Sequence, residues 1–119
     1  MKKIFFLLAL AFGLNLSAQS LYKQFDADAY AQDLSDKIIT KLDITNGDLQ
    51  EKIQNQTYIY AQSLKKHLLL AEKNGNTQGK TLQEALSMVK NDALNASGFL
   101  KTLEKWLNSE QMGVIRELL

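Results

Sequence analysis

Very few side chains of this chain could take part in catalysis or bind a metal ion. The 119 residues include no Cys and a single His, His67. No thiol nucleophile, disulfide or Fe–S site is therefore available, and a zinc site needs more His or Cys ligands than one. The sequence also has no glycine-rich phosphate loop and no nucleophile elbow. We therefore expect no enzyme activity, no cofactor and no metal, and we interpret His67 as a core or interface residue.

Apolar side chains outside the expected core are the remaining candidates for a function. One stripe, formed by Met88, Phe99 and Trp106, is rotated away from the main apolar stripe of the helix predicted over 81–107. Tyr58 and Leu69 lie on the outward side of the helix predicted from about 45 to 73. One interpretation is that these side chains pack against neighbouring helices. The other is that they form a surface for a second subunit or a bound polypeptide.

The overall charge gives no reason to expect a nucleic-acid partner. The sequence has 14 basic and 13 acidic residues and a pI of about 7.9, whereas nucleic-acid-binding domains usually carry a strong basic excess. Loss of residues 1–18 would remove Lys2 and Lys3 and change the net charge from +1 to −1. We therefore expect no nucleic-acid partner.

The first residues are typical of a bacterial export signal. Lys2 and Lys3 precede an apolar run, and small residues follow near Ala18. We predict a cleaved signal peptide over residues 1–18, with cleavage after Ala18 or after Ser20. The apolar run is shorter than the ~20 residues of a spanning helix, which argues against an uncleaved anchor. We expect a periplasmic or secreted protein with no integral membrane segment after cleavage.

Helical periodicity continues through the rest of the chain. The pattern predicts a first helix over 27–41 capped by Asp26 or Asp28, a long helix from about 45 to 73, a loop over 74–80, a helix over 81–107 with a weak stretch at 95–98, and a short last helix to 119. Three turns carry the spacing of N-terminal caps. Their residues are Ile44, Thr45 and Asp48; Thr81 and Glu84; and Leu107, Asn108 and Gln111.

Long helices joined by short polar loops pack antiparallel. We therefore predict an all-α fold: a long antiparallel helical hairpin with a short N-terminal helix and a short C-terminal helix, forming a small bundle that dimerises. No segment shows the alternation typical of a strand. The expected organisation is a signal peptide over 1–18, a flexible N-terminus over 19–26 and a single helical domain over 27–119.

Two of the capping turns share a form. Residues 44–48 read Ile-Thr-Asn-Gly-Asp and residues 107–111 read Leu-Asn-Ser-Glu-Gln. They resemble the paired LTxxQ motif of the Spy/CpxP-like periplasmic proteins, although Asp48 replaces the Gln of the motif and Asn108 replaces its Thr. The resemblance implies a curved, dimeric helical hairpin, with ATP-independent chaperoning of unfolded envelope proteins or stress sensing. It also implies that the motif residues are structural.

Two functions follow as hypotheses. The first is an exported helical protein that binds non-native polypeptides without nucleotide, through apolar and amphipathic faces. The alternative is a structural or partner-specific adaptor of the cell envelope with no chaperone activity. An enzyme would require carboxylates with shifted pKa values in a cleft, for which a thin helical hairpin offers little room.

Overall fold

The computed structural model describes residues 20–119, and every regular element in that range is an α-helix. The helices are α2 (Leu21–Gln24), α3 (Ala27–Lys41), α4 (Gly47–Lys73), α5 (Leu82–Ser97), α6 (Phe99–Glu104) and α7 (Ser109–Leu118). The all-α prediction is confirmed, since no strand occurs in this range. The predicted signal peptide over 1–18 lies outside the described residues. None of the described helices combines the length and apolarity needed to cross a membrane.

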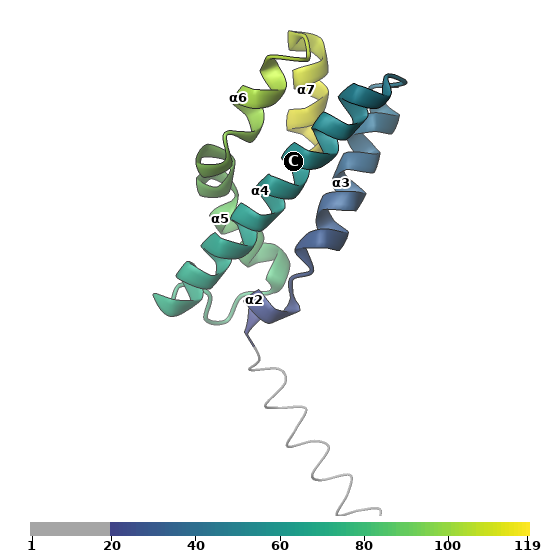
Figure 1. Cartoon of the computed structure of the whole chain (residues 1–119). Helices are drawn as coiled ribbons and strands as arrows, with labels where there is room; N and C mark the ends of the chain where they lie inside the picture. The colour runs from purple at the N-terminus through teal and green to yellow at the C-terminus, as the bar shows by residue number, and fades with distance from the viewer. Residues whose placement is uncertain (1–19) are drawn as a thin grey trace, which may run out of the picture.

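Helix α4 is the centre of the bundle (Figure 1). It packs antiparallel against α3 on one side and against α5 on the other, whereas α3 and α5 do not contact each other. Helix α7 packs on α3 and α6, and α2 packs on α4 and α5. The expected α4–α5 hairpin is present, and α3 adds a third long arm that contacts α4 as extensively as α5 does.

The core follows the apolar stripe of α4. The buried residues of this helix recur every three or four positions, as one face of an amphipathic helix does: Ile53, Thr57, Tyr60, Ala61, Leu64, Leu68 and Ala71. Each large aliphatic side chain in this set contributes about 1.5–3 kcal/mol through burial. The buried Thr57 hydroxyl donates to the Ile53 carbonyl at 2.7 Å, so this hydroxyl is paired within its own helix.

The turn before α4 differs from the prediction. Asn46 is the N-cap, and its side-chain oxygen accepts from the backbone N–H of Leu49 at 3.1 Å. Thr45 is exposed and lies one residue too early, so Thr45 and Asp48 form no capping box. The chain reaches this position through Asp43, whose φ of 52° lies in the left-handed region. Buried Ile44 closes the turn, and its carbonyl accepts from the Gln50 side chain at 2.7 Å.

The single helix predicted over 81–107 is divided in two. Gly98 adopts φ 64° and ψ 26°, ending α5 and starting α6. A left-handed residue is favourable for glycine, and it rotates the following helix relative to α5. Phe99 is consequently 0% exposed, whereas Ala96 is exposed. Of the two interpretations of Phe99, the structure supports packing against neighbouring helices and not a surface for a partner.

Residues 20–26, part of the stretch predicted to be flexible, are held against the bundle. The Glu72 carboxylate accepts from the Ser20 hydroxyl at 2.6 Å and from the Tyr22 backbone N–H. The Lys65 ammonium lies 5.0 Å from the centroid of the Tyr22 ring, and Phe25 is buried. These contacts fix α2 across the end of α4. The sequence of residues 20–26 is a short mixture of polar and apolar side chains and does not predict these contacts.

Candidate functional site

A groove with a volume of about 460 Å³ lies between α3 and α4. Helix α3 provides most of its lining, and α4 closes the other side with Gln54 and Tyr58. The full lining is Asp28, Ala31, Gln32, Ser35, Asp36, Gln54 and Tyr58. Asp28, Gln32 and Asp36 are four residues apart and therefore form one row along α3, and the small side chains of Ala31 and Ser35 leave the space beside that row open.

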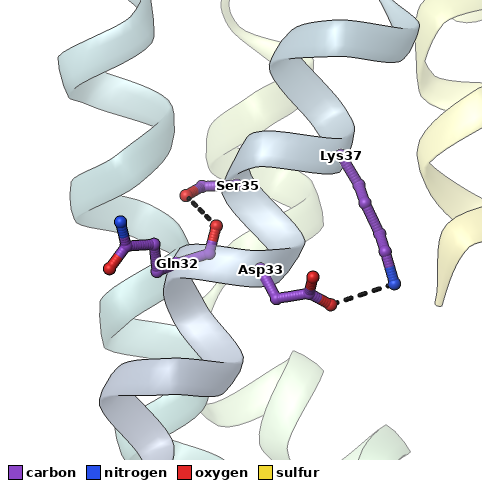
Figure 2. A network of polar contacts seen from close by, with 4 residues as sticks. All are labelled: Gln32, Asp33, Ser35 and Lys37. Atoms are coloured by element: carbon purple, nitrogen blue, oxygen red, sulfur yellow. Dashed lines mark hydrogen bonds and ion pairs between the residues drawn. The ribbon is translucent and has the colours of Figure 1, made fainter.

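Figure 2 shows how α3 separates its polar groups. Ser35, 3% exposed, donates its hydroxyl to the Gln32 backbone carbonyl at 3.1 Å and so needs no partner from the groove. Lys37 and Asp33 form an ion pair at 2.9 Å on a different side of the helix. The one lysine near the middle of α3 is therefore bound to a carboxylate that does not line the groove.

The groove carboxylates have no basic partner. Within residues 20–119, the ion pairs shorter than 4.0 Å are Lys37–Asp33 and Arg116–Glu104. Asp28 lies in the first turn of α3, where the helix N-terminus favours a negative charge, but Asp36 lies in mid-helix. The groove thus presents two exposed, uncompensated carboxylates beside two amide side chains and the Tyr58 ring, which is 49% exposed.

A second cavity of about 160 Å³ lies where α3, α4 and α5 meet the last residue, Leu119. Tyr30 and Tyr60 line it, and burial raises the pKa of both phenols, with the nearby Tyr30 also raising that of Tyr60. The Tyr60 hydroxyl is buried and makes no well-formed hydrogen bond, only a weak contact with the Tyr30 side chain. Lys90 donates to the Leu119 carbonyl at 3.3 Å at the rim of this cavity.

The predicted surface residues are dispersed over the bundle. Tyr58 lines the groove, and Met88 on α5 is 40% exposed. Leu69 on α4 and Trp106, just after α6, are half-buried, and the Lys52 ammonium lies 5.5 Å from the Trp106 ring. With Phe99 in the core, only Tyr58 of this set belongs to the groove.

The capping residues hold helix ends and do not line the groove. Thr81 and Glu84 form a reciprocal capping box, with the Glu84 carboxylate 3.0 Å and the Thr81 hydroxyl 3.2 Å from the partner backbone nitrogens. Asn108 and Gln111 form a second one, at 2.8 and 2.9 Å. Leu107, which precedes that box, is buried. These two predicted caps are confirmed.

His67 is half-buried on α4, and its Nδ1 lies 2.8 Å from the Ser63 carbonyl oxygen. Because a carbonyl can only accept, Nδ1 carries the proton in this contact. Within the described residues, no group of three or more His, Asp or Glu side chains is placed to hold a metal ion. The contact gives His67 a structural role within α4.

Comparisons with protein-family models, curated proteins and solved structures find no match to this chain. The groove therefore has to be interpreted from its own residues. Sequence reasoning identified none of Gln32, Ser35, Asp36 and Gln54 as site residues, and it interpreted Asp28 only as a possible helix cap. The signal available was the repeat of Asp28, Gln32 and Asp36 at intervals of four, on a stripe free of basic residues.

Proposed function

We propose that this protein is exported and binds non-native or partner polypeptides, without nucleotide, in the groove between α3 and α4. The observation that carries the proposal is the groove itself: about 460 Å³ of open space between two helices, bordered by an exposed tyrosine and by carboxylate and amide side chains. The capping residues have structural roles in this proposal.

The groove offers the types of contact that polypeptides use. Tyr58 provides a large, rigid apolar surface with little entropy to lose on binding. Gln32 on α3 and Gln54 on α4 both line the groove, and their amides can both donate to and accept from a peptide backbone. Because no deep apolar pocket is present there, we expect weak binding of many sequences, as suits a chaperone-like role.

Export and self-association are parts of the same proposal. The basic and apolar N-terminal residues support export to the periplasm or outside the cell. The resemblance of two turns to the LTxxQ motif supports a role in the cell envelope and a homodimer. Trp106 and Met88, on the α5–α6 arm, are the remaining candidates for a dimer surface, since Phe99 is in the core.

An aggregation assay with a groove variant tests the proposal. Light scattering of an unrelated, chemically denatured protein on dilution should fall when the exported protein is added at near-equal molar ratio. Tyr58→Ser should remove most of this effect. Ile59→Ser is the matched control, because Ile59 is the next residue, is 45% exposed and does not line the groove.

The outcomes separate the two hypotheses. No suppression at several-fold excess would reject the chaperone-like role. If the protein then captured one defined envelope protein and Tyr58→Ser abolished that capture, the adaptor function would stand instead. Equal loss of activity in both variants would show that the groove is not the binding site.

A further inference from the structure

We propose that the groove selects extended segments carrying two basic residues four positions apart, one for Asp28 and one for Asp36. This inference rests on the proposed function, because it specifies which polypeptide segments the same groove prefers. It concerns the charge and conformation of the bound segment, which the general proposal leaves open.

The first argument is electrostatic. Asp28 and Asp36 are exposed and have no basic partner in the described part of the chain, while Asp33, on the same helix, is already paired with Lys37. Both unpaired carboxylates line the groove, and no lysine or arginine lines it. A cationic segment therefore gains two ion pairs there without breaking an existing one, whereas an acidic segment meets two like charges.

The second argument is spacing. Asp28 and Asp36 are eight residues apart on α3, which places their backbone positions about 12 Å apart at the helical rise of about 1.5 Å per residue. An extended chain covers about 3.3 Å per residue. Basic side chains four positions apart in an extended segment point to the same face and lie about 13 Å apart, which matches the separation of the two carboxylates.

The third argument is size. A helical segment 12 Å long with a diameter of about 10–12 Å fills about 1,000 Å³. An extended segment of the same length, with strand spacings of about 4.8 and 10 Å, fills about 600 Å³. Of the two, the extended segment is the less bulky, so an open groove between two helices accommodates it more easily.

Tyr58 also favours a positively charged side chain in the bound segment. Its half-exposed ring lies in the groove with the two carboxylates, and a Lys or Arg side chain that crosses the ring makes a favourable cation–π contact. An apolar residue between the two basic residues would occupy the space above Ala31 and the buried Ser35. The preferred segment is therefore basic–apolar–basic.

Labelled peptides and a charge series on α3 test this inference by fluorescence anisotropy. One 15-residue peptide of Gly, Ser, Gln and Leu carries two Lys residues four positions apart. Matched peptides carry Gln or Glu at those positions, or the two Lys residues eight positions apart, which suits a helix. The protein variants are Asp28→Asn and Asp36→Asn, with Asp33→Asn as the matched control outside the groove.

The Lys peptide with spacing four should bind most tightly. Each groove variant should weaken it by about two- to fivefold, the range for an exposed ion pair, and Asp33→Asn should leave its affinity unchanged. Raising the salt concentration should reduce the difference between the Lys and Gln peptides. Unfolding by circular dichroism checks that each variant is folded.

Four results would overturn the inference. If Lys and Gln peptides bind equally and Tyr58→Ser weakens both, the charge selection is wrong and the polypeptide-binding proposal remains. If Asp33→Asn weakens binding as much as Asp28→Asn, the preference is general electrostatics and not the groove. If the peptide with spacing eight binds best, the bound segment is helical. Absence of binding by every peptide would reject both proposals.

Discussion

The ring of Tyr60 stacks on the ring of Phe99, with centroids 5.0 Å apart and an interplanar angle of 23°. Tyr60 also meets Tyr30 edge to face at 6.3 Å, and Tyr30 meets Phe25 in the same way at 5.5 Å. A row of four rings thus connects the residue after α2 to α6 through the middle of the bundle. The left-handed turn at Gly98 completes this row, because it directs Phe99 inward.

Replacing Phe99 with Ala should destabilise the fold by about 3–5 kcal/mol, since it removes a fully buried ring and leaves a cavity beside Tyr60. Met88→Ala, at an exposed position of α5, should change the free energy of unfolding by less than about 0.5 kcal/mol. Urea unfolding followed by circular dichroism measures both. Similar small effects for the two variants would mean that Phe99 is not in the core.

The cap of α4 can be tested with two adjacent variants. Asn46→Ala should cost about 1 kcal/mol, because the Leu49 N–H loses its side-chain acceptor. Thr45→Ala should cost less than about 0.5 kcal/mol, because Thr45 is exposed and caps no helix. Thermal unfolding of both proteins decides between the positions. A larger loss for Thr45→Ala would place the start of α4 one residue earlier.

The caps show what the sequence could and could not predict. Thr81 and Asn108 were identified because each is followed three residues later by a side chain that reaches back, which is a two-residue signal. Thr45 and Asn46 are adjacent and both good N-caps, so the choice depends on the backbone turn at Asp43, which no local pattern encodes. The helices themselves follow from periodicity, which reports burial over many residues.

The Gly98 break and the groove depend on tertiary structure. A glycine within a helical pattern can continue the helix at a modest cost, and only packing of Phe99 against Tyr60 makes the left-handed conformation favourable here. Similarly, Asp28, Gln32 and Asp36 have the spacing of any solvent-exposed helix face. They border a groove because Ala31 and Ser35 are small and Tyr58 on α4 lines the other side. The groove therefore depends on how two helices pack together, and the pattern within one helix does not reveal it.

The capping box of α5 should make stability depend on acid pH. The backbone hydrogen bond from Thr81 holds the pKa of the Glu84 carboxyl below its ordinary value of 4.5. A lowered folded-state pKa means that the stabilisation is present above 4.5 and is lost as pH falls through the folded-state pKa. The difference in Tm between the wild type and Glu84→Ala should therefore become smaller as the pH falls from 7 to 3.

A constant difference between those two proteins across this pH range would contradict the hydrogen bond to the charged carboxylate. Thr81→Ala provides the companion measurement. It should cost about 1 kcal/mol at pH 7 through loss of the cap, and unchanged thermal stability would mean that α5 begins elsewhere.

Trp106 should contribute more to self-association than to folding. Its ring is half-buried beside the Lys52 ammonium, so truncation removes less core than Phe99→Ala does. Light scattering of the exported protein should give the mass of a dimer, and Trp106→Ala should lower it toward that of a monomer. A monomeric wild type would remove the dimer from the proposal.

Replacing Tyr60 with Phe should leave the protein about as stable at pH 7, because the buried Tyr60 hydroxyl makes no well-formed hydrogen bond and only a weak contact with the Tyr30 side chain. An unpaired buried hydroxyl costs about 1–3 kcal/mol, so removing it without changing the ring can recover part of that cost. Tyr58→Phe, at an exposed hydroxyl, is the control and should have little effect. Urea unfolding at pH 7 gives both values.

The same variant should change the response to alkali. Burial raises the pKa of Tyr60 above its ordinary value of 10 in the folded state. Below pH 10 the Tyr60 phenol is neutral in both the folded and the unfolded state. As the pH rises from 10 toward the folded-state pKa, the phenol ionises in the unfolded state first, and the folded wild type loses stability. Tyr60→Phe should unfold at higher pH than the wild type, although Tyr30, whose pKa burial also raises, retains part of the effect. Alkaline titration followed by circular dichroism measures the midpoints, and identical midpoints would show that Tyr60 ionises as freely in the folded chain as in the unfolded one.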